Sequence, residues 1–116
     1  IEVVADVPTP EADQLPAEAQ ATNSAEGIIT FLSDSLHGAM TASGVPYDKD
    51  SMVAAHKDLP LGTLVTVTNL FNGKNVVVEI VDRVPPTVTA LIDVSSAAAR
   101  ELGMTDSGMV DGRIDW

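Results

Sequence analysis

Apolar and polar residues alternate at residues 64–68, and a second β-branched run follows at residues 75–81. Residues 64–68 (LVTVT) and 75–81 (NVVVEIV) are rich in β-branched side chains, which is typical of strands. Phe71-Asn72-Gly73-Lys74 separates the two runs, and Asn-Gly is the strongest short signal for a hairpin turn. The pattern therefore predicts an antiparallel pair of strands joined by a tight turn.

Shorter apolar runs predict further strands on either side of this hairpin. They lie at residues 28–32, 52–55, 91–94 and 110–116. Residues 37–46 and 84–87 contain the glycines and prolines of loops. Several short strands without a long helix favour a closed, mainly β barrel, and the four methionines of the chain are expected to fill its core.

One segment near the C-terminus has a helical pattern instead. Ser95 or Ser96 is suited to accept hydrogen bonds from the first turn of a helix that runs to Leu102. Gly103 follows at once and is the usual residue for ending a helix in the left-handed conformation. A short helix is expected between the last two strands.

Residues 1–26 differ in composition from the rest of the chain. They are rich in Pro, Ala, Glu and Gln and carry six acidic residues but no Lys or Arg. Such a segment buries too little apolar surface to offset the entropy of ordering, so we expect an extended acidic tail before a domain at residues 27–116. Ile1, Val3 and Val4 are apolar and form either a frayed terminus or a strand added to a partner.

Charge and composition exclude several classes of function. The formal net charge of −11 opposes binding to nucleic acid, anionic lipid and other polyanions. The absence of cysteine excludes disulfides, a thiol nucleophile and thiolate metal sites. No apolar run is long enough to span a membrane. His37 and Asp34 are too few ligands to indicate a metal site, and no cofactor is expected.

Seven sequence blocks together resemble the rare-lipoprotein-A-like double-psi β-barrel family over about ninety residues, from Gly27 to Trp116. The resemblance implies a six-stranded barrel with one or two short helices and a groove across one face. It also implies export to the periplasm or cell envelope after removal of a signal peptide. Active members resemble lytic transglycosylases, which cleave the bond between N-acetylmuramic acid and N-acetylglucosamine in peptidoglycan. The blocks are TASG (41–44), AAHKDLPLGT (54–63), VTVTNL (65–70), NGK (72–74), DR (82–83), IDVS (92–95) and AAARELGM (97–104).

The residues that the family uses for catalysis are only partly retained. The family has a Glu after a Ser-Gly or Asn-Gly pair, a His eleven positions later, and an Asp in an Asp-Arg pair. These positions are Val45, His56 and Asp82 here, so the expected glutamate is absent. Valine cannot transfer a proton, and glycoside cleavage needs an acid at the bridging oxygen. The resemblance places the other groove residues at Phe31, Thr41, Ser43, Arg83 and Asp93.

Three functions follow from this mixture of retained and lost residues. The first is a non-catalytic component of the envelope that binds peptidoglycan glycan strands or other envelope proteins. The second is an active lytic transglycosylase that uses Asp82 with His56. The third is a glycan-binding module without cleavage. The oligomeric state is not fixed by any of them.

Several of these residues also have structural interpretations. Asp82 is suited to accept backbone N–H groups at the crossing loop, and Arg83 is expected to pair with Asp82 or Asp93. Asp93 is expected to cap the turn that follows it. Trp116 either closes the last strand or anchors a partner.

Overall fold

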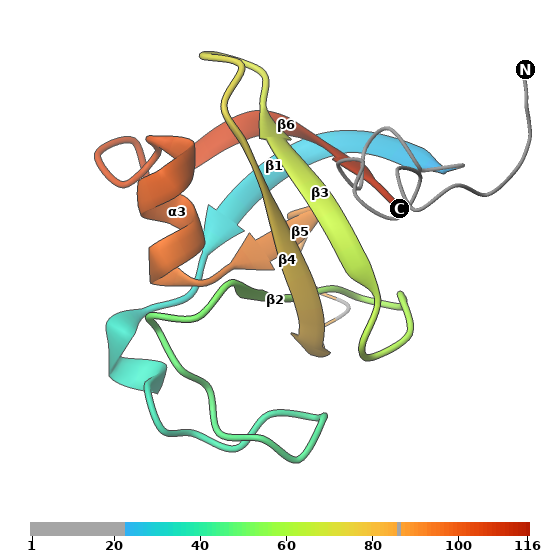
Figure 1. Cartoon of the computed structure of the whole chain (residues 1–116), viewed down its shortest axis with the longest axis vertical. Helices are drawn as coiled ribbons and strands as arrows, with labels where there is room; N and C mark the ends of the chain where they lie inside the picture. Colours follow the sequence, from blue (N-terminus) through green and yellow to red (C-terminus); the bar gives the residue numbers. More distant parts are fainter. Residues whose placement is uncertain (1–22, 86) are drawn as a thin grey trace, which may run out of the picture.

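The computed structural model describes residues 23–85 and 87–116 as one closed barrel (Figure 1). The predicted tail, with Ile1, Val3 and Val4, lies outside the described residues except at its last four positions. The strands and helices are β1 (Ser24–Phe31), the 3₁₀ helix η1 (Asp34–Leu36), β2 (Val53–Ala55), β3 (Leu64–Asn69), β4 (Asn75–Asp82), β5 (Ile92–Val94), α3 (Ser96–Leu102) and β6 (Met109–Asp115).

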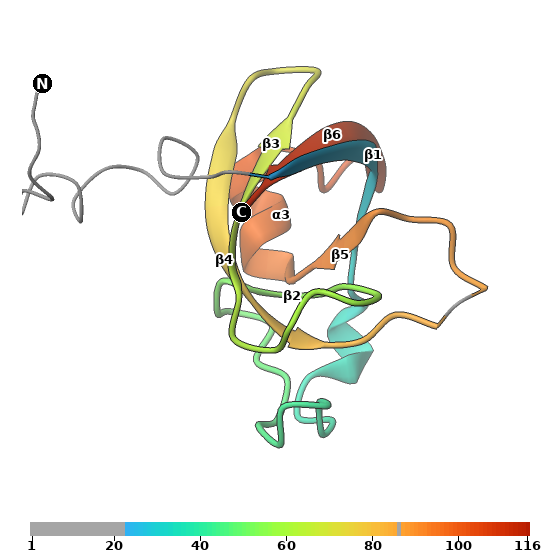
Figure 2. The same cartoon turned by 90° about the vertical axis from the view of Figure 1, so that its right-hand side faces the viewer.

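The strands follow the order β1-β5-β2-β4-β3-β6 around the barrel. Two pairs, β1/β5 and β2/β4, are parallel, and the remaining pairs are antiparallel. Two connections join strands that flank a third strand. The segment 32–52 joins β1 to β2 on either side of β5, and the segment 83–91, described except at residue 86, joins β4 to β5 on either side of β2. Both project from the barrel (Figure 2). The predicted mainly β, six-stranded barrel with one or two short helices is confirmed.

The core is aliphatic, as the low aromatic content requires. Ile29, Ile80 and Ile114 are fully buried inside the barrel, and Leu102 joins the same cluster from α3. Removing such side chains from water is the main stabilising contribution to a small domain. The expectation for the methionines is correct only for Met104, because Met40, Met52 and Met109 are exposed.

The local signals for the hairpin and the helix are confirmed. Thr66 pairs with Val77 and Val67 with Val76, in the predicted antiparallel register. The Ser95 side chain accepts a hydrogen bond from the N–H of Ala98 at 3.2 Å. Gly103 ends the helix with a φ of 69°.

Strand β1 begins four residues before the predicted start at Ile28. Ser24 pairs with Asp115 and Gly27 with Gly112, so the first half of β1 is held by β6. The backbones of Asn23 and Trp116 extend this pairing through two hydrogen bonds of 3.0 Å each. Residues 24–27 have few apolar side chains, so their sequence does not predict a strand. Their extended conformation depends on pairing with β6, which is distant in the sequence.

Candidate functional site

The structure brings His56 and Asp82 together at the ends of β2 and β4. Ala55 is the Cα partner of Asp82, and the N–H of His56 donates to the Asp82 carbonyl at 3.1 Å. A bulge between Ala54 and Ala55 shifts the register at this point. Bulges often occur beside functional sites because they redirect side chains. The two residues predicted to carry catalysis are therefore neighbours.

The loop at residues 41–45 crosses the end of β4 and is fixed by Asp82. One carboxylate oxygen of Asp82, Oδ1, accepts from the N–H of Ala42 at 3.0 Å and from the N–H of Arg83 at 2.8 Å. The N–H of Ser43 donates to the Val81 carbonyl at 3.0 Å. Thr41 is buried and its hydroxyl donates to the Val45 carbonyl at 2.5 Å. Asp82 thus has the structural role that its position in the sequence suggested.

This role predicts different effects for two substitutions of Asp82. Asp82→Ala leaves the N–H groups of Ala42 and Arg83 without their acceptor and should lower the free energy of unfolding by about 2 kcal/mol. Asp82→Asn keeps an oxygen at Oδ1 and should cost less than about 1 kcal/mol. Denaturant unfolding of the two variants measures the difference. Equal losses in both would show that the carboxylate charge, and not the acceptor geometry, is what matters.

His56 is buried, with 8% of its surface exposed, and one of its ring nitrogens is already used. Nδ1 accepts from the N–H groups of Asp58 and Leu59, each at 3.2 Å. Burial lowers the pKa of His56, and the positive charges of Arg83 and Lys57 act in the same direction. The Asp58 carboxylate, 3.3 Å from Nδ1, raises it, but that side chain is 87% exposed and screened by water. His56 is therefore neutral at pH 7, with its proton on Nε2.

The lowered pKa of His56 predicts how stability depends on pH. The unfolded chain takes up this proton near the ordinary value of 6.5, whereas the folded protein does so only at lower pH. The contribution of His56 to stability is therefore fully present above pH 6.5 and is lost as the pH falls toward the folded pKa.

We expect His56→Asn, whose oxygen can replace Nδ1 as acceptor, to reduce the loss of unfolding free energy between about pH 7 and about pH 5. The wild-type chain, measured at the same two pH values, provides the reference slope. Denaturant unfolding at both pH values checks this. A wild-type slope in His56→Asn would contradict the assignment.

Arg83 does not pair with Asp82 or Asp93, so that prediction is wrong. Its Nη1 donates to the carbonyl of Leu59 at 2.5 Å and to the carbonyl of His56 at 3.3 Å. These contacts tie the segment after β2 to the end of β4. The guanidinium thus supplies donors to backbone carbonyls of the segment that follows β2.

Asp93 lies in the same row of residues as Asp82. Ala55 is the Cα partner of both, and Thr30 is the next partner beyond Asp93. Strands are spaced about 4.8 Å apart, so the Cα atoms of the two aspartates are about 10 Å apart across Ala55. The expected turn cap is wrong, because Asp93 Oδ1 accepts from the Thr30 hydroxyl and Ser95 caps the helix.

Val45 is 59% exposed and lines an open hollow of about 480 Å³. A second hollow, of about 240 Å³, lies beside His56 and is also lined by Lys57 and Asp58. Val45 does not line this second hollow. Ser43 and Glu79 also line the Val45 hollow. Glu79 was not predicted as a site residue, although the alternation along β4 places it on the outer face. The hollow beside Val45, where the family has its glutamate, is therefore also lined by an acidic residue of β4.

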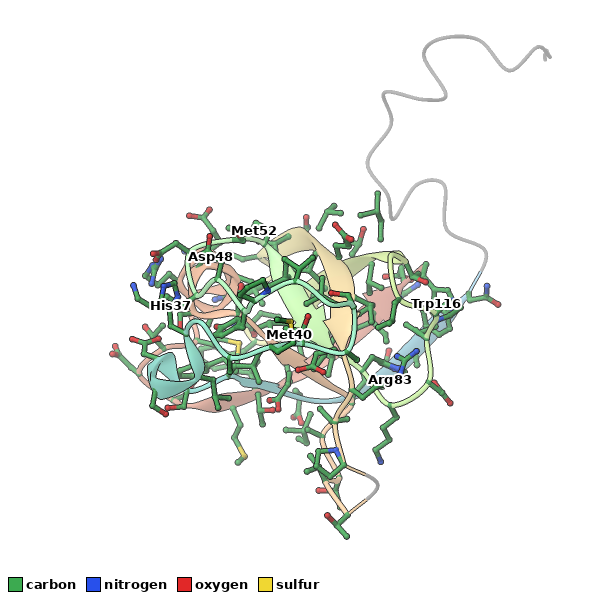
Figure 3. The ribbon with its side chains drawn as sticks, turned by 90° about the horizontal axis from the view of Figure 1, so that it is seen from below. His37, Met40, Asp48, Met52, Arg83 and Trp116 are labelled. Carbon is green, nitrogen blue, oxygen red and sulfur yellow. The ribbon has the colours of Figure 1, made fainter. Side chains whose placement is uncertain are left out.

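The remaining predicted residues lie at the margins of this site. Phe31 pairs with Val94 and packs against the core, so its ring is not an open platform. Trp116 also packs against the core and pairs with Asn23, consistent with closing the last strand. Figure 3 shows Arg83 and His37 on opposite sides of one face, with Met40 between them.

Asp34 and His37 each form a hydrogen bond within the protein. His37 Nδ1 accepts from the N–H of Lys49 at 3.2 Å, and Asp34 accepts from the Ser96 hydroxyl. Within residues 23–85 and 87–116, no three His, Cys, Asp or Glu residues form a group that could hold a metal ion. Neither of the helices in these ranges has the length and apolar character needed to cross a membrane.

Two solved structures share this fold. The Streptomyces papain inhibitor has a TM-score of 0.65 at 25% identity, over 82% of this chain and 94% of that one. An expansin from Clavibacter michiganensis, solved as a point mutant in complex with cellohexaose, has a TM-score of 0.62 at 21% identity, over 79% of this chain and 49% of that one. These similarities concern the fold.

Sequence relatives are more informative about the family. The chain is 44% identical over 89 residues to a probable endolytic peptidoglycan transglycosylase RlpA from Synechocystis, covering 77% of this chain and 28% of that protein. It is 44% identical over 90 residues to the endolytic peptidoglycan transglycosylase RlpA of Pasteurella multocida, covering 78% and 31%. The chain thus spans between a quarter and a third of these relatives. A family model described as lytic transglycolase matches residues 29–114. The chain therefore belongs to the lytic transglycolase family, as an RlpA-like double-psi β-barrel.

Proposed function

We propose that this barrel is a non-catalytic, peptidoglycan-associated component of the cell envelope. The observation that carries the proposal is Val45, which occupies the position of the expected glutamate and presents an aliphatic side chain at the rim of a hollow. A general acid contributes about 10²- to 10⁴-fold to such reactions. The framework around Val45 is retained, so the loss concerns the chemistry and not the fold.

The remaining polar groups support a structural use of the site. Oδ1 of Asp82 holds the 41–45 loop, and Nδ1 of His56 holds the segment after β2. The Arg83 guanidinium is bound to backbone carbonyls. Each of these groups contributes to the barrel without a reaction, which explains how they persist beside Val45.

The association with peptidoglycan comes from the relatives, whose names describe enzymes that act on this polymer. Sedimentation of the purified chain with insoluble peptidoglycan tests it. We expect a fraction of the protein to sediment that increases with the amount of peptidoglycan. Protein that stays entirely in solution would overturn the association and would leave docking onto other envelope proteins as the remaining form of a non-catalytic role.

A second candidate is an active lytic transglycosylase that uses Asp82 with His56. It is favoured by the free groups on both residues, since Asp82 retains Oδ2 and His56 retains an N–H at Nε2. It requires Asp82, whose Oδ1 already accepts from the N–H groups of Ala42 and Arg83, to supply the proton without the family's glutamate. The missing glutamate makes the non-catalytic role our preferred conclusion.

A further inference from the structure

Phe71 differs from the other aromatic residues of the chain. The ring of Tyr47 is buried, and Phe31 and Trp116 pack against the core. Phe71 is 88% exposed at the tip of the turn between β3 and β4. An isolated exposed apolar side chain needs no explanation, but one at the edge of an apolar hollow is a candidate binding surface.

Such a hollow of about 530 Å³ lies between this turn and the segment 103–111. Leu70, Phe71 and Met109 contribute apolar surface, and Asp106 and Asp111 contribute carboxylates. Neither carboxylate makes a hydrogen bond or ion pair with the residues that the structure describes. A mainly apolar hollow of this size with a few convergent polar groups is typical of ligand sites.

The hollow is far from the groove of His56 and Asp82. In Figure 1 the tip of the β3–β4 hairpin and the loop after α3 lie at one end of the molecule, and the 33–52 connection lies at the other. Strand β4 (Asn75–Asp82) runs between the two ends, and at about 3.3 Å per residue it separates them by roughly 23 Å. The hollow is therefore a different site.

Both walls of the hollow are held in place before any ligand binds. The buried Asn69 accepts the N–H of Phe71 at its Oδ1, at 2.9 Å, and donates from Nδ2 to the Leu102 carbonyl at 2.9 Å. Asn72 donates to the same carbonyl at 3.0 Å. On the other wall, the N–H of Gly108 donates to the carbonyl of the buried Met104 at 3.0 Å. Preorganised walls reduce the entropic cost of binding.

The chemistry of the hollow suits a neutral sugar chain. The C–H face of a pyranose ring can stack on the negative face of the Phe71 ring, and its hydroxyl groups can donate to the carboxylates of Asp106 and Asp111. Anionic ligands would be repelled by these carboxylates. A wholly apolar protein segment would bury them without hydrogen-bond donors, which costs free energy.

We propose that Phe71, Asp106 and Asp111 form a second glycan-binding site, at the opposite end of the barrel from the groove, for the uncharged sugar rings of a glycan chain. This inference rests on the proposed association with peptidoglycan. It adds a site that the groove does not supply, and it gives the barrel a means to hold a glycan strand without cleaving it.

Titration of the whole chain with chitohexaose, followed by amide chemical shifts, tests this site. We expect shifts concentrated at residues 69–72 and 103–111, and a loss of affinity of about tenfold or more in Phe71→Ala. Met40→Ala removes another exposed apolar side chain, at the other end of the barrel, and should bind as the wild type does. The amide spectrum of each variant also verifies its fold.

Two results would overturn the second site. One is a set of shifts confined to the surroundings of His56 and Asp82 with unchanged binding in Phe71→Ala. The other is the absence of any shift while the wild-type chain sediments with peptidoglycan. If the wild-type chain neither shifts nor sediments, the proposed association with peptidoglycan fails together with the second site.

Discussion

Val45→Glu should release anhydro-muropeptides from purified peptidoglycan at about 10²-fold above the background that the wild-type chain and a protein-free sample share. The substitution supplies a carboxyl group at the position where the family has its glutamate. We expect the low end of the range for a general acid because Asp82 and His56 are already engaged by backbone N–H groups. Val45 is 59% exposed, so the larger side chain fits without disturbing the core.

The matched control for this experiment is Val45→Gln. Glutamine has the size and polarity of glutamate but cannot donate a proton to the bridging oxygen. We expect Val45→Gln to release no more product than the wild type, as measured by mass spectrometry of the soluble fragments. Equal product from Val45→Glu and Val45→Gln would mean that the missing acid is not what limits this groove.

Gly112→Ala should produce the largest loss of stability, about 3 kcal/mol. Gly112 lies on β6, where a Cβ atom would come within 1.9 Å of Ile29 Cδ1 and 2.9 Å of the Thr68 carbonyl oxygen. Ile29 is fully buried in the core, and Thr68 belongs to the adjacent strand β3. The Ile29 side chain would have to change rotamer within the packed core, and the Thr68 backbone would have to shift.

Gly27→Ala is the control for this position, because Gly27 is the Cα partner of Gly112 on β1. A Cβ atom there would be 3.0 Å from Leu91 Cβ, a contact that a shift of a few tenths of an ångström relieves. Thermal or denaturant unfolding should show a much smaller loss for Gly27→Ala. Similar losses in both variants would contradict the view that the Ile29 contact makes Gly112 necessary.

The structural elements that were predicted correctly from the sequence are those determined by a few adjacent residues. The Asn-Gly turn, the Ser95 cap and the Gly103 helix end are each defined by a few adjacent residues, and all three are present. The closed barrel was predicted from the number of short strands and from the family resemblance. The first half of β1 was not, because its conformation is fixed by β6, some ninety residues away.

The details of the site were less predictable because they depend on contacts between distant segments. The proximity of His56 and Asp82 was expected, but the actual partners of Arg83 were not. A guanidinium beside an aspartate suggests an ion pair, yet the open backbone carbonyls of His56 and Leu59 are its partners. Likewise, nothing in the local sequence around Phe71 indicates that the loop after α3 completes a hollow beside it.

The most direct test of the central claim is incubation of the wild-type chain with purified peptidoglycan, followed by mass spectrometry of the soluble products. Our account predicts no anhydro-muropeptides above the level of a sample without protein, because Val45 cannot serve as the acid. Release of anhydro-muropeptides by the wild-type chain that disappears in Asp82→Asn would contradict it and would establish Asp82 as the acid of an active lytic transglycosylase.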